Sequence, residues 1–122
     1  MAKILIVEDD PHINKALRIR LESAGHEIEV ASDSYLGFQL AASRVHDLMI
    51  LDLSMPAGEG FNIVERLQAT GGQDVPFVVL TASKRPECRA RALELGARDF
   101  IEKPFVSKRL VRRVDQALAG AA

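Results

Sequence analysis

A regular alternation along the chain constrains its fold more than any other feature. Short runs rich in apolar and β-branched residues occur at residues 3–7, 27–31, 48–51, 77–80 and 99–102. Longer stretches with helical spacing separate these runs. Strands that alternate with helices pair in parallel, because each crossover helix returns the chain to the same end of the sheet. The sequence therefore predicts an α/β fold with five parallel strands and five helices.

Apolar residues three or four positions apart mark the helical stretches. Ile13, Leu17 and Leu21 fall on one face of the first expected helix, and Gly25 follows as a stop signal. The other four helices are expected around residues 34–43, 61–67, 86–95 and 110–118.

The strands differ in how apolar they are, and this difference predicts their order. Residues 4–7, 48–51 and 77–80 are apolar almost throughout, which is typical of strands covered on both faces. The second and fifth strands are more mixed, as expected at the edges of a sheet. We therefore predict a single doubly wound (βα)5 domain with strand order 2-1-3-4-5, which is flavodoxin-like. In such a sheet, ligands bind beyond the carboxyl ends of the strands, between strands 1 and 3.

The length and charge of the chain limit its domain count and its partners. We expect residues 1–122 to form one domain, with residues 119–122 as a tail or the stub of a linker. The formal net charge of -1 gives no general attraction to nucleic acid or to an anionic membrane. An acid at Glu8 stands where a secretory signal would continue its apolar stretch, so we expect a cytoplasmic protein.

Reactive polar side chains follow four of the predicted strands. Glu8 and Asp9 follow the first strand, Asp52 the third, Thr81 the fourth and Lys103 the fifth. One such residue means little, because every strand must end. Since the carboxyl ends of parallel strands meet at one edge, four together predict a functional site there.

The charges expected at this edge suggest a metal ion. Three carboxylates face one ammonium group, and clustered carboxylates are costly unless they are paired or coordinated. A hard divalent cation with oxygen ligands would balance them, and Mg²⁺ suits a site that also binds phosphate. An aspartate beside such an ion, a lysine and a hydroxyl can accept a phosphoryl group as an aspartyl phosphate.

Four motifs in this order and spacing resemble a known family. They are ILIVEDDP at residues 4–11, DLSMP at 52–56, LTA at 80–82 and KPF at 103–105. Over essentially the whole chain they resemble the response-regulator receiver domain of two-component signalling. The resemblance implies a phosphorelay switch that takes a phosphoryl group from a sensor histidine kinase or a phosphotransfer protein. Such a receiver catalyses its own phosphorylation and dephosphorylation and is not an enzyme that acts on outside substrates.

The resemblance also implies a phosphoacceptor and a set of metal ligands. Asp52 would accept the phosphoryl group. Asp9 and Asp52 would bind Mg²⁺ directly, and Glu8 would bind it through water. The backbone carbonyl of Ser54 would add a further ligand.

The remaining motif residues are implied to stabilise and report the phosphorylated state. Lys103 would pair with the phosphoryl oxygens, and the Lys103–Pro104 peptide bond would be cis. Thr81 would move to hydrogen-bond the phosphoryl group, and Phe100 would turn inward as the switch aromatic. Most relatives that carry tyrosine at that position gain a hydroxyl, which Phe100 lacks. The change would alter the face of the fourth helix, fifth strand and fifth helix, which a downstream protein or a covalently attached effector domain would read.

Two other functions fit parts of the pattern. A degenerate receiver would bind partners without phosphorylation, but the complete set of Asp52, Thr81 and Lys103 argues against it. A Mg²⁺-dependent phosphatase with an aspartyl nucleophile usually needs a second acid two residues later, where this chain has Ser54. Phe100 also has a simpler interpretation, as an ordinary core residue of an edge strand.

Charges near the last helix bear on dimer formation. Lys108, Arg109, Arg112 and Arg113 form a basic cluster that is either a solvated face or a docking patch. In relatives that dimerise through this region, Asp99 and Arg113 would match one cross-dimer pair. Arg109 would instead face Arg89, and like charges oppose pairing. We therefore expect a monomer before phosphorylation and doubt this dimer mode afterwards.

The three histidines do not form a metal-ligand set by their spacing. We expect His12, His26 and His46 at the surface or at its boundary.

Overall fold

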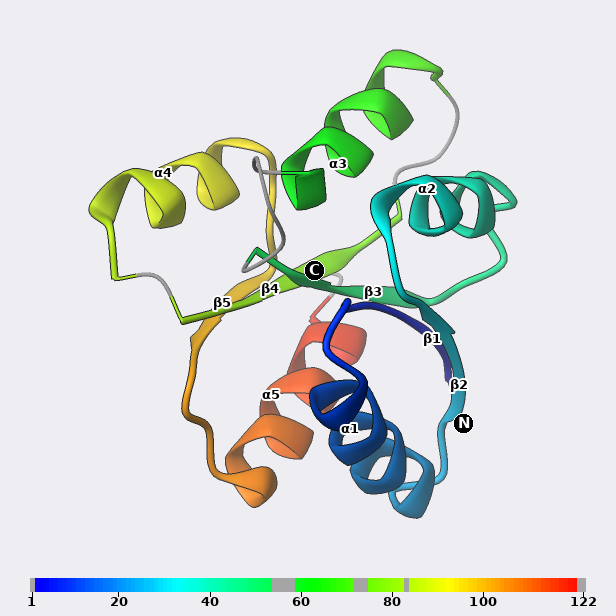
Figure 1. Ribbon diagram of the computed structural model, residues 1–122, viewed down its shortest axis with the longest axis vertical. Coiled ribbons are helices and arrows are strands. Elements are labelled where there is room, and N and C mark those ends of the chain that lie inside the picture. The colour runs from blue at the N-terminus through cyan, green and yellow to red at the C-terminus, as the bar shows by residue number, and fades with distance from the viewer. Residues whose placement is uncertain (1, 54–58, 72–74, 83, 121–122) are drawn as a thin grey trace.

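Five strands and five helices alternate along the chain in the computed structural model, which describes residues 2–53, 59–71, 75–82 and 84–120 (Figure 1). The strands are β1 (Lys3–Val7), β2 (Glu27–Ala31), β3 (Leu48–Asp52), β4 (Phe77–Thr81) and β5 (Asp99–Glu102). The helices are α1 (Pro11–Ser23), α2 (Ser34–Ala42), α3 (Glu59–Ala69), α4 (Pro86–Glu94) and α5 (Ser107–Ala119).

The strands form one parallel sheet in the order β2-β1-β3-β4-β5, which confirms the predicted order. Helices α2, α3 and α4 cover one face of the sheet, and α1 and α5 cover the other (Figure 1). The chain therefore has the doubly wound, flavodoxin-like (βα)5 architecture that its alternating pattern predicted.

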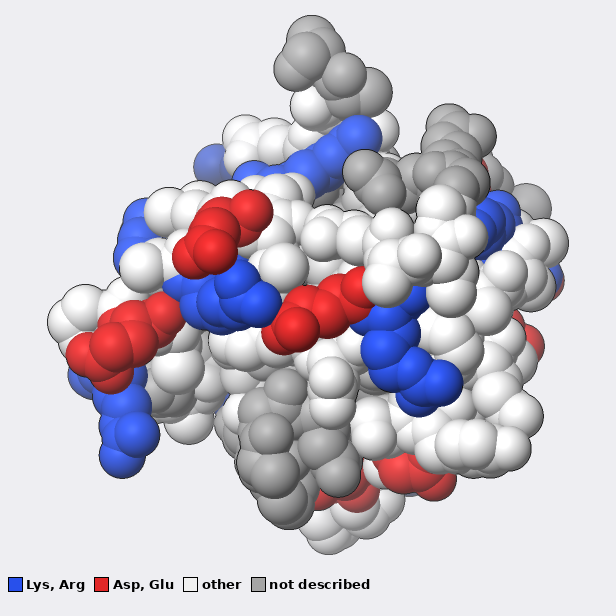
Figure 2. Space-filling view, turned by 90° about the horizontal axis from the view of Figure 1, so that it is seen from above, with Lys and Arg blue, Asp and Glu red and all other residues white. Residues whose placement is uncertain are grey.

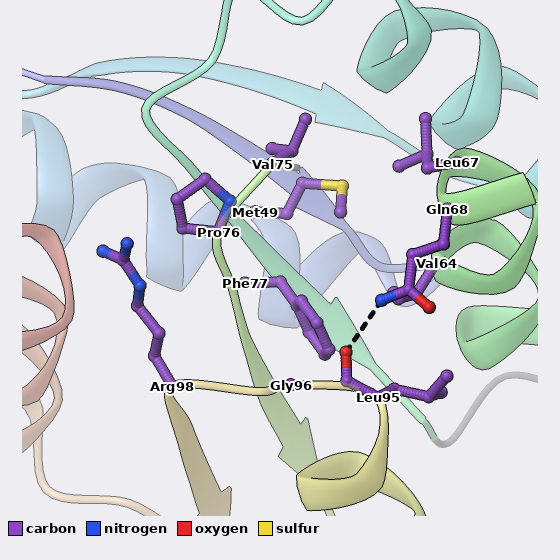
Figure 3. Close-up of a pocket in the computed structure, with 10 residues that line it drawn as sticks. All are labelled: Met49, Val64, Leu67, Gln68, Val75, Pro76, Phe77, Leu95, Gly96 and Arg98. Carbon is purple, nitrogen blue, oxygen red and sulfur yellow. Dashed lines mark hydrogen bonds between the residues drawn. The ribbon is translucent and has the colours of Figure 1, made fainter. Parts of the chain in front are cut away.

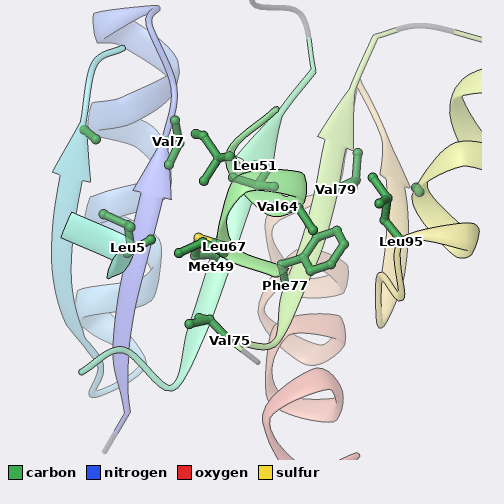
Figure 4. Packing of buried hydrophobic residues seen from close by; sticks show 14 of the residues in the cluster. Leu5, Val7, Met49, Leu51, Val64, Leu67, Val75, Phe77, Val79 and Leu95 are labelled. Carbon is green, nitrogen blue, oxygen red and sulfur yellow. The ribbon is translucent and has the colours of Figure 1, made fainter. Parts of the chain in front are cut away.

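Successive side chains of the central strands point to opposite faces of the sheet, as strand geometry requires. Leu5 and Val7 belong to the core between the sheet and helices α2–α4, which Figure 4 shows. Ile4 and Ile6 belong to the second core, beneath α1 and α5. All four side chains are fully buried. This double burial explains why the strand is apolar along its length rather than alternating.

Two strands extend one residue further than the sequence pattern predicted. Asp52 is the last residue of β3 and pairs in register with Leu80 of β4. Thr81 is the last residue of β4 and pairs with Glu102 of β5. The parallel ladder continues through these polar residues, so hydrogen-bonded backbone holds both functional candidates at the edge of the sheet.

Local signals in the sequence set the ends of α1. The Asp10 side chain accepts hydrogen bonds from the backbone N–H groups of His12 and Ile13, and Pro11 occupies the first turn. Gly25 follows the helix with a φ of 95°, a conformation that glycine adopts without steric cost. In the part of the chain that the structure describes, no helix is long and apolar enough to cross a bilayer.

Candidate functional site

The fold brings the polar residues that follow the strands to one edge of the sheet. Lys103 follows β5, and its Nζ lies 2.7 Å from Asp52 Oδ2 at the end of β3. The same Nζ lies 3.2 Å from Glu8 Oε1, directly after β1. One ammonium group thus contacts two carboxylates that lie 51 and 95 positions before it in the sequence, those of Asp52 and Glu8. Only the parallel sheet brings these groups together.

The carboxylates of this edge differ in their access to water. Glu8 is 1% exposed and Asp52 is 2% exposed, whereas Asp9 is exposed. The Lys103 side chain is 13% exposed and Thr81 is fully buried. Two buried acids therefore share one partly buried ammonium group, and an exposed acid lies beside them. The site carries more negative charge than its own lysine neutralises.

This crowding changes the proton affinity of the site. Burial, together with the hydrogen bond and the charge of Asp52, raises the pKa of Glu8 to about 8. The Asp10 N–H and the Lys103 ammonium act in the opposite direction but do not overcome burial. Burial also disfavours the charge on Lys103, yet Asp52 and Glu8 outweigh it and raise the pKa of Lys103. Without a metal ion, Glu8 is therefore largely protonated near neutral pH.

The donor set at this edge fits a divalent cation. One carboxylate oxygen from each of Glu8, Asp9 and Asp52 lies within 4.8 Å of the other two. Hard cations such as Mg²⁺ take carboxylate oxygens as ligands, and a divalent charge would balance the negative excess. Ser54, whose backbone carbonyl is the fourth predicted ligand, lies outside the described residues.

Backbone contacts fix the strand ends around the site. The Lys103 N–H donates to the Thr81 carbonyl at 2.8 Å, and the Leu53 N–H donates to the Leu80 carbonyl at 3.0 Å. The Lys103–Pro104 peptide bond is cis. Lys103 and Thr81 are thus tied through the backbone as well as placed at the same edge.

Asn14 is a residue of this region that sequence reasoning missed. From the first turns of α1, its Nδ2 donates to the Glu8 carbonyl at 2.7 Å. Its Oδ1 is buried, with no hydrogen-bond partner among the described residues. No spacing or motif signal marks this contact, because it depends on how α1 packs against the turn after β1.

Phe100, the expected switch aromatic, lies inside the molecule in this structure. It is 5% exposed and belongs to the core cluster that includes Ala92 and Leu95 near α4. The Arg89 guanidinium lies over its ring, 5.7 Å from the centroid. The side chain is therefore a core residue here, and its role as a switch stays a prediction.

The expectation for the histidines is wrong for His46. Its side chain is fully buried, and its Nε2 lies 2.7 Å from Glu29 Oε1. His46 precedes β3, so it lies at the other end of that strand from Asp52. The packing of the turn before β3 buries this ring, a tertiary effect that spacing does not reveal. His12 is exposed and His26 is partly buried beside Asp115, as expected.

A hollow lies away from the acidic edge, near the start of β4 (Figure 3). It has a volume of about 230 Å³, and most of its lining is apolar, including Met49 and Phe77. Across it, Gln68 Nε2 donates to the Leu95 carbonyl at 2.9 Å. The hollow brings together no nucleophile and base, so the acidic edge is the stronger candidate for chemistry.

Comparison with known proteins agrees with this geometry. Residues 4–115 match the model of the family described as the response regulator receiver domain. The chain belongs to this family. This receiver domain is therefore a signalling domain of two-component systems.

Relatives of this receiver domain include a transcriptional regulator, another receiver domain and a chemotaxis protein. The DNA-binding dual master transcriptional regulator RpaA from Synechocystis sp. is 36% identical over 115 residues, which cover 93% of this chain and 48% of that protein. The non-phosphorylated HemR receiver domain from Leptospira biflexa is 35% identical, with a TM-score of 0.87 over 98% of this chain and 95% of that one. The Vibrio cholerae chemotaxis protein CheY4 is 29% identical, with a TM-score of 0.85 over 96% of this chain and 98% of that one. The receiver domain spans about half the length of the curated relatives it matches.

Proposed function

We propose that this receiver domain accepts a phosphoryl group on Asp52 in a Mg²⁺-dependent reaction and reports it to a partner. The contact between Lys103 Nζ and Asp52 Oδ2, at 2.7 Å beside a second buried carboxylate, carries the proposal. A buried aspartate that faces a cation and a candidate metal cluster suits the transfer of a highly charged group.

The proposed reaction is a displacement at phosphorus. An Asp52 carboxylate oxygen attacks the phosphorus of a phosphohistidine, so an O–P bond forms as the N–P bond breaks. The departing imidazole nitrogen keeps the electron pair and takes a proton from solvent. Hydrolysis reverses the state, because water attacks the acyl phosphate, releases inorganic phosphate and restores the Asp52 carboxylate.

Each residue at the edge has a role in this proposal. Glu8, Asp9, Asp52 and the Ser54 carbonyl would hold Mg²⁺, with Glu8 acting through water. The bound ion supplies charge neutralisation for the transferring oxygens. On phosphorylation, the Lys103 ammonium group gives up its contact with the Asp52 carboxylate and pairs with the phosphoryl oxygens instead.

The proposed readout runs from Thr81 of β4 to the neighbouring edge strand β5. Thr81 hydrogen-bonds the phosphoryl group, and Phe100 adjusts with it, so the face built from α4, β5 and α5 changes. The donor is a sensor histidine kinase or a phosphotransfer protein. The reader is a downstream protein or an effector domain on the same polypeptide, for which residues 119–122 would serve as the start of a linker. Regulators about twice this length support the second option.

The test is the intact mass of the protein after incubation with acetyl phosphate. We expect a gain of about 80 Da, one phosphoryl group, in the presence of Mg²⁺ and none in EDTA. Asp52→Asn should gain nothing. Asp10→Asn is the matched control, because asparagine also caps a helix, the Asp10 side chain accepts the capping hydrogen bonds of α1, and the Asp10 backbone N–H that faces Glu8 is unchanged. It should gain the same mass as the wild type.

Two outcomes would contradict this function. A mass gain that persists in Asp52→Asn would place the phosphoryl group on another residue. Steady release of product from an external phosphomonoester would indicate a phosphatase instead of a receiver.

A further inference from the structure

Glu8 is held at each of its polar atoms, although it lies beyond the end of β1. Its backbone N–H donates to the Ala31 carbonyl at 3.0 Å, and its carbonyl accepts from Asn14 Nδ2 at 2.7 Å. Its Oε2 accepts from the Asp10 N–H at 3.3 Å, and its Oε1 accepts from Lys103 Nζ at 3.2 Å. Of these contacts, the one from Asn14 can be removed by a single substitution that changes no charge at the site.

The Asn14 contact takes the place of a strand partner. The paired residues of β1 end at Val7, opposite Ala31 of β2 and Leu51 of β3. The Glu8 carbonyl therefore lies past the paired residues, and because Glu8 is buried this carbonyl needs a donor from the protein. Asn14, near the start of α1, reaches back across six positions and supplies that donor.

The two ends of the Asn14 carboxamide are used unequally. Its Nδ2 donates to Glu8, whereas its Oδ1 is buried with no partner among the residues that the structure describes. The reverse orientation of the amide would set its oxygen against the Glu8 carbonyl oxygen, and two acceptors repel each other. A buried acceptor without a partner is unfavourable, and asparagine is a poor helix former. An apolar residue would avoid both costs, so the amide serves the donor contact rather than the stability of α1.

The contact fixes a peptide unit that joins two candidate metal ligands. The Glu8 carbonyl and the Asp9 N–H belong to one planar peptide group. A hydrogen bond to its oxygen restricts rotation of this plane, and the plane sets the directions in which the side chains of Glu8 and Asp9 leave the backbone. One carboxylate oxygen of each lies within 4.8 Å of the other and of one from Asp52. Asn14 therefore acts on the part of the backbone that makes the acidic pair converge.

We propose that Asn14 is a positioning residue for the Mg²⁺ ligands. It holds the peptide unit between Glu8 and Asp9, so that both carboxylates are in place before the cation arrives. The inference rests on the proposed function, because that function requires the cation. Ligands that are already in place bind a cation more tightly, since less conformational freedom is lost on binding.

A purely structural role for Asn14 predicts a different result. If Asn14 only anchored α1 on the turn after β1, its removal would lower stability, and metal binding would suffer through unfolding. If Asn14 positions the ligands, metal binding falls in a domain that stays folded. Stability and metal affinity measured on the same variants therefore separate the two roles.

The experiment titrates Mg²⁺ into the unphosphorylated domain by calorimetry and measures urea unfolding in EDTA. Asn14→Leu removes the donor and the unpartnered oxygen together, with little change in size. We expect it to bind Mg²⁺ about tenfold more weakly, at the lower end of the losses that follow removal of a metal ligand's hydrogen-bond partner. Its urea midpoint should fall by less than about 0.3 M, because losing the unpartnered oxygen offsets losing the hydrogen bond.

Two further variants locate the effect at the amide donor. Asn14→Gln keeps an amide on a longer side chain, and it should bind Mg²⁺ at least about threefold more tightly than Asn14→Leu. Gln39→Leu is the matched control, because it removes an amide from the exposed face of α2, where Nε2 donates to the Tyr35 hydroxyl at 3.0 Å instead of to Glu8. It should bind Mg²⁺ as the wild type does.

Phosphorylation by acetyl phosphate gives a second readout. In Asn14→Leu, the Mg²⁺ concentration that gives half the maximal rate should rise about tenfold, in step with the affinity. The rate at saturating Mg²⁺ should stay within about twofold of the wild-type rate. A positioning residue changes how much cation is needed, whereas a distorted site would also lower the saturated rate.

Several results would overturn the positioning role. They are equal Mg²⁺ affinity in the wild type and Asn14→Leu, a loss of affinity that Asn14→Gln does not reduce, and an equal loss in Gln39→Leu. A large fall in the urea midpoint together with a lower saturated rate would show a structural role instead.

The same measurements separate this inference from the proposed function. Mg²⁺-dependent phosphorylation that is insensitive to Asn14 refutes the positioning role alone. Mg²⁺ binding that depends on Asn14, without any phosphorylation, refutes the proposed function alone. A wild-type domain that binds no Mg²⁺ refutes both.

Discussion

Lys103 Nζ contacts both buried carboxylates of the acidic edge, at 2.7 Å from Asp52 and 3.2 Å from Glu8. A single cation does not neutralise two buried acids and the exposed Asp9 beside them. Burial, together with the hydrogen bond and the charge of Asp52, raises the pKa of Glu8. At the scale of the residue, the site of the unmodified protein is therefore arranged for additional positive charge.

The raised pKa of Glu8 predicts how stability depends on pH when metal is absent. Glu8 loses its proton near pH 4.5 in the unfolded chain and near pH 8 in the folded one. Folding therefore takes up a proton between these values, and the free energy of unfolding falls as the pH rises through this window. We expect the urea midpoint in EDTA to fall across the window for the wild type and to change less for Glu8→Gln.

The size of the effect is measurable. Across this window, the fall in the free energy of unfolding should be larger for the wild type than for Glu8→Gln by at least about 1 kcal/mol. This lower bound is smaller than the energy of one pKa unit, because Glu8 shares the proton with Asp52. Glu27→Gln, which alters an exposed carboxylate, should follow the wild type. A Glu8→Gln variant with the wild-type slope would show that Glu8 does not carry the proton.

At the scale of the element, α2 packs unusually close to the sheet and to α3. A β-carbon placed on Gly37 would lie 3.0 Å from Ile63 Cδ1 and 3.1 Å from both γ-carbons of Val7. These distances are shorter than ordinary contacts between carbon atoms. Glycine at this position therefore lets α2 lie against β1 and α3 at the same time, on the side of the core that Figure 4 shows.

A larger residue at position 37 should weaken this packing. We expect Gly37→Val to lower the free energy of unfolding by about 1–3 kcal/mol, because overpacked side chains force neighbours to shift. Ala42→Val is the control, since it places the same side chain at an exposed position of the same helix. It should cost less than about 0.7 kcal/mol in urea unfolding. Equal losses in the two variants would mean that the close approach contributes nothing.

At the scale of the whole molecule, charge is distributed unevenly. Acidic and basic side chains are interleaved over the face that α2, α3 and α4 cover (Figure 2). On that face Arg91 pairs with Glu65 and with Glu94, each at 3.0 Å. A groove between β5 and the first turns of α5 is instead lined by three arginines and one carboxylate. A near-neutral chain thus has a locally basic surface beside α5.

This distribution predicts the oligomeric state of the domain. We expect the mass of one chain by light scattering, both in buffer and with beryllium fluoride and Mg²⁺. The reason is that pairing through the face of α4, β5 and α5 would bring Arg109 of one chain against Arg89 of the other. Asp99 and Arg113, which would form a cross-dimer pair, bind each other within one chain. A two-chain mass on activation would show that this face pairs despite its charge.

The sequence predicted the order of the strands and the residues of the acidic edge because both depend on local patterns. Apolar runs marked the central strands, and Glu8, Asp52 and Thr81 each followed one of them. Lys103 followed the more mixed fifth strand. The parallel arrangement then required these four strand ends to meet at one edge. The resemblance to the receiver family implied a cis bond before Pro104, and the structure has one.

Other features depend on contacts between residues distant in the sequence, and only the tertiary structure decided them. The burial of His46 beside Glu29, the hydrogen bond from Asn14 to Glu8 and the pairing of Arg113 with Asp99 leave no periodic signal. Each depends on the distance and angle at which two elements pack. Periodicity identifies which face of an element is buried, but the side chain that this face meets is set by the packing of the whole domain.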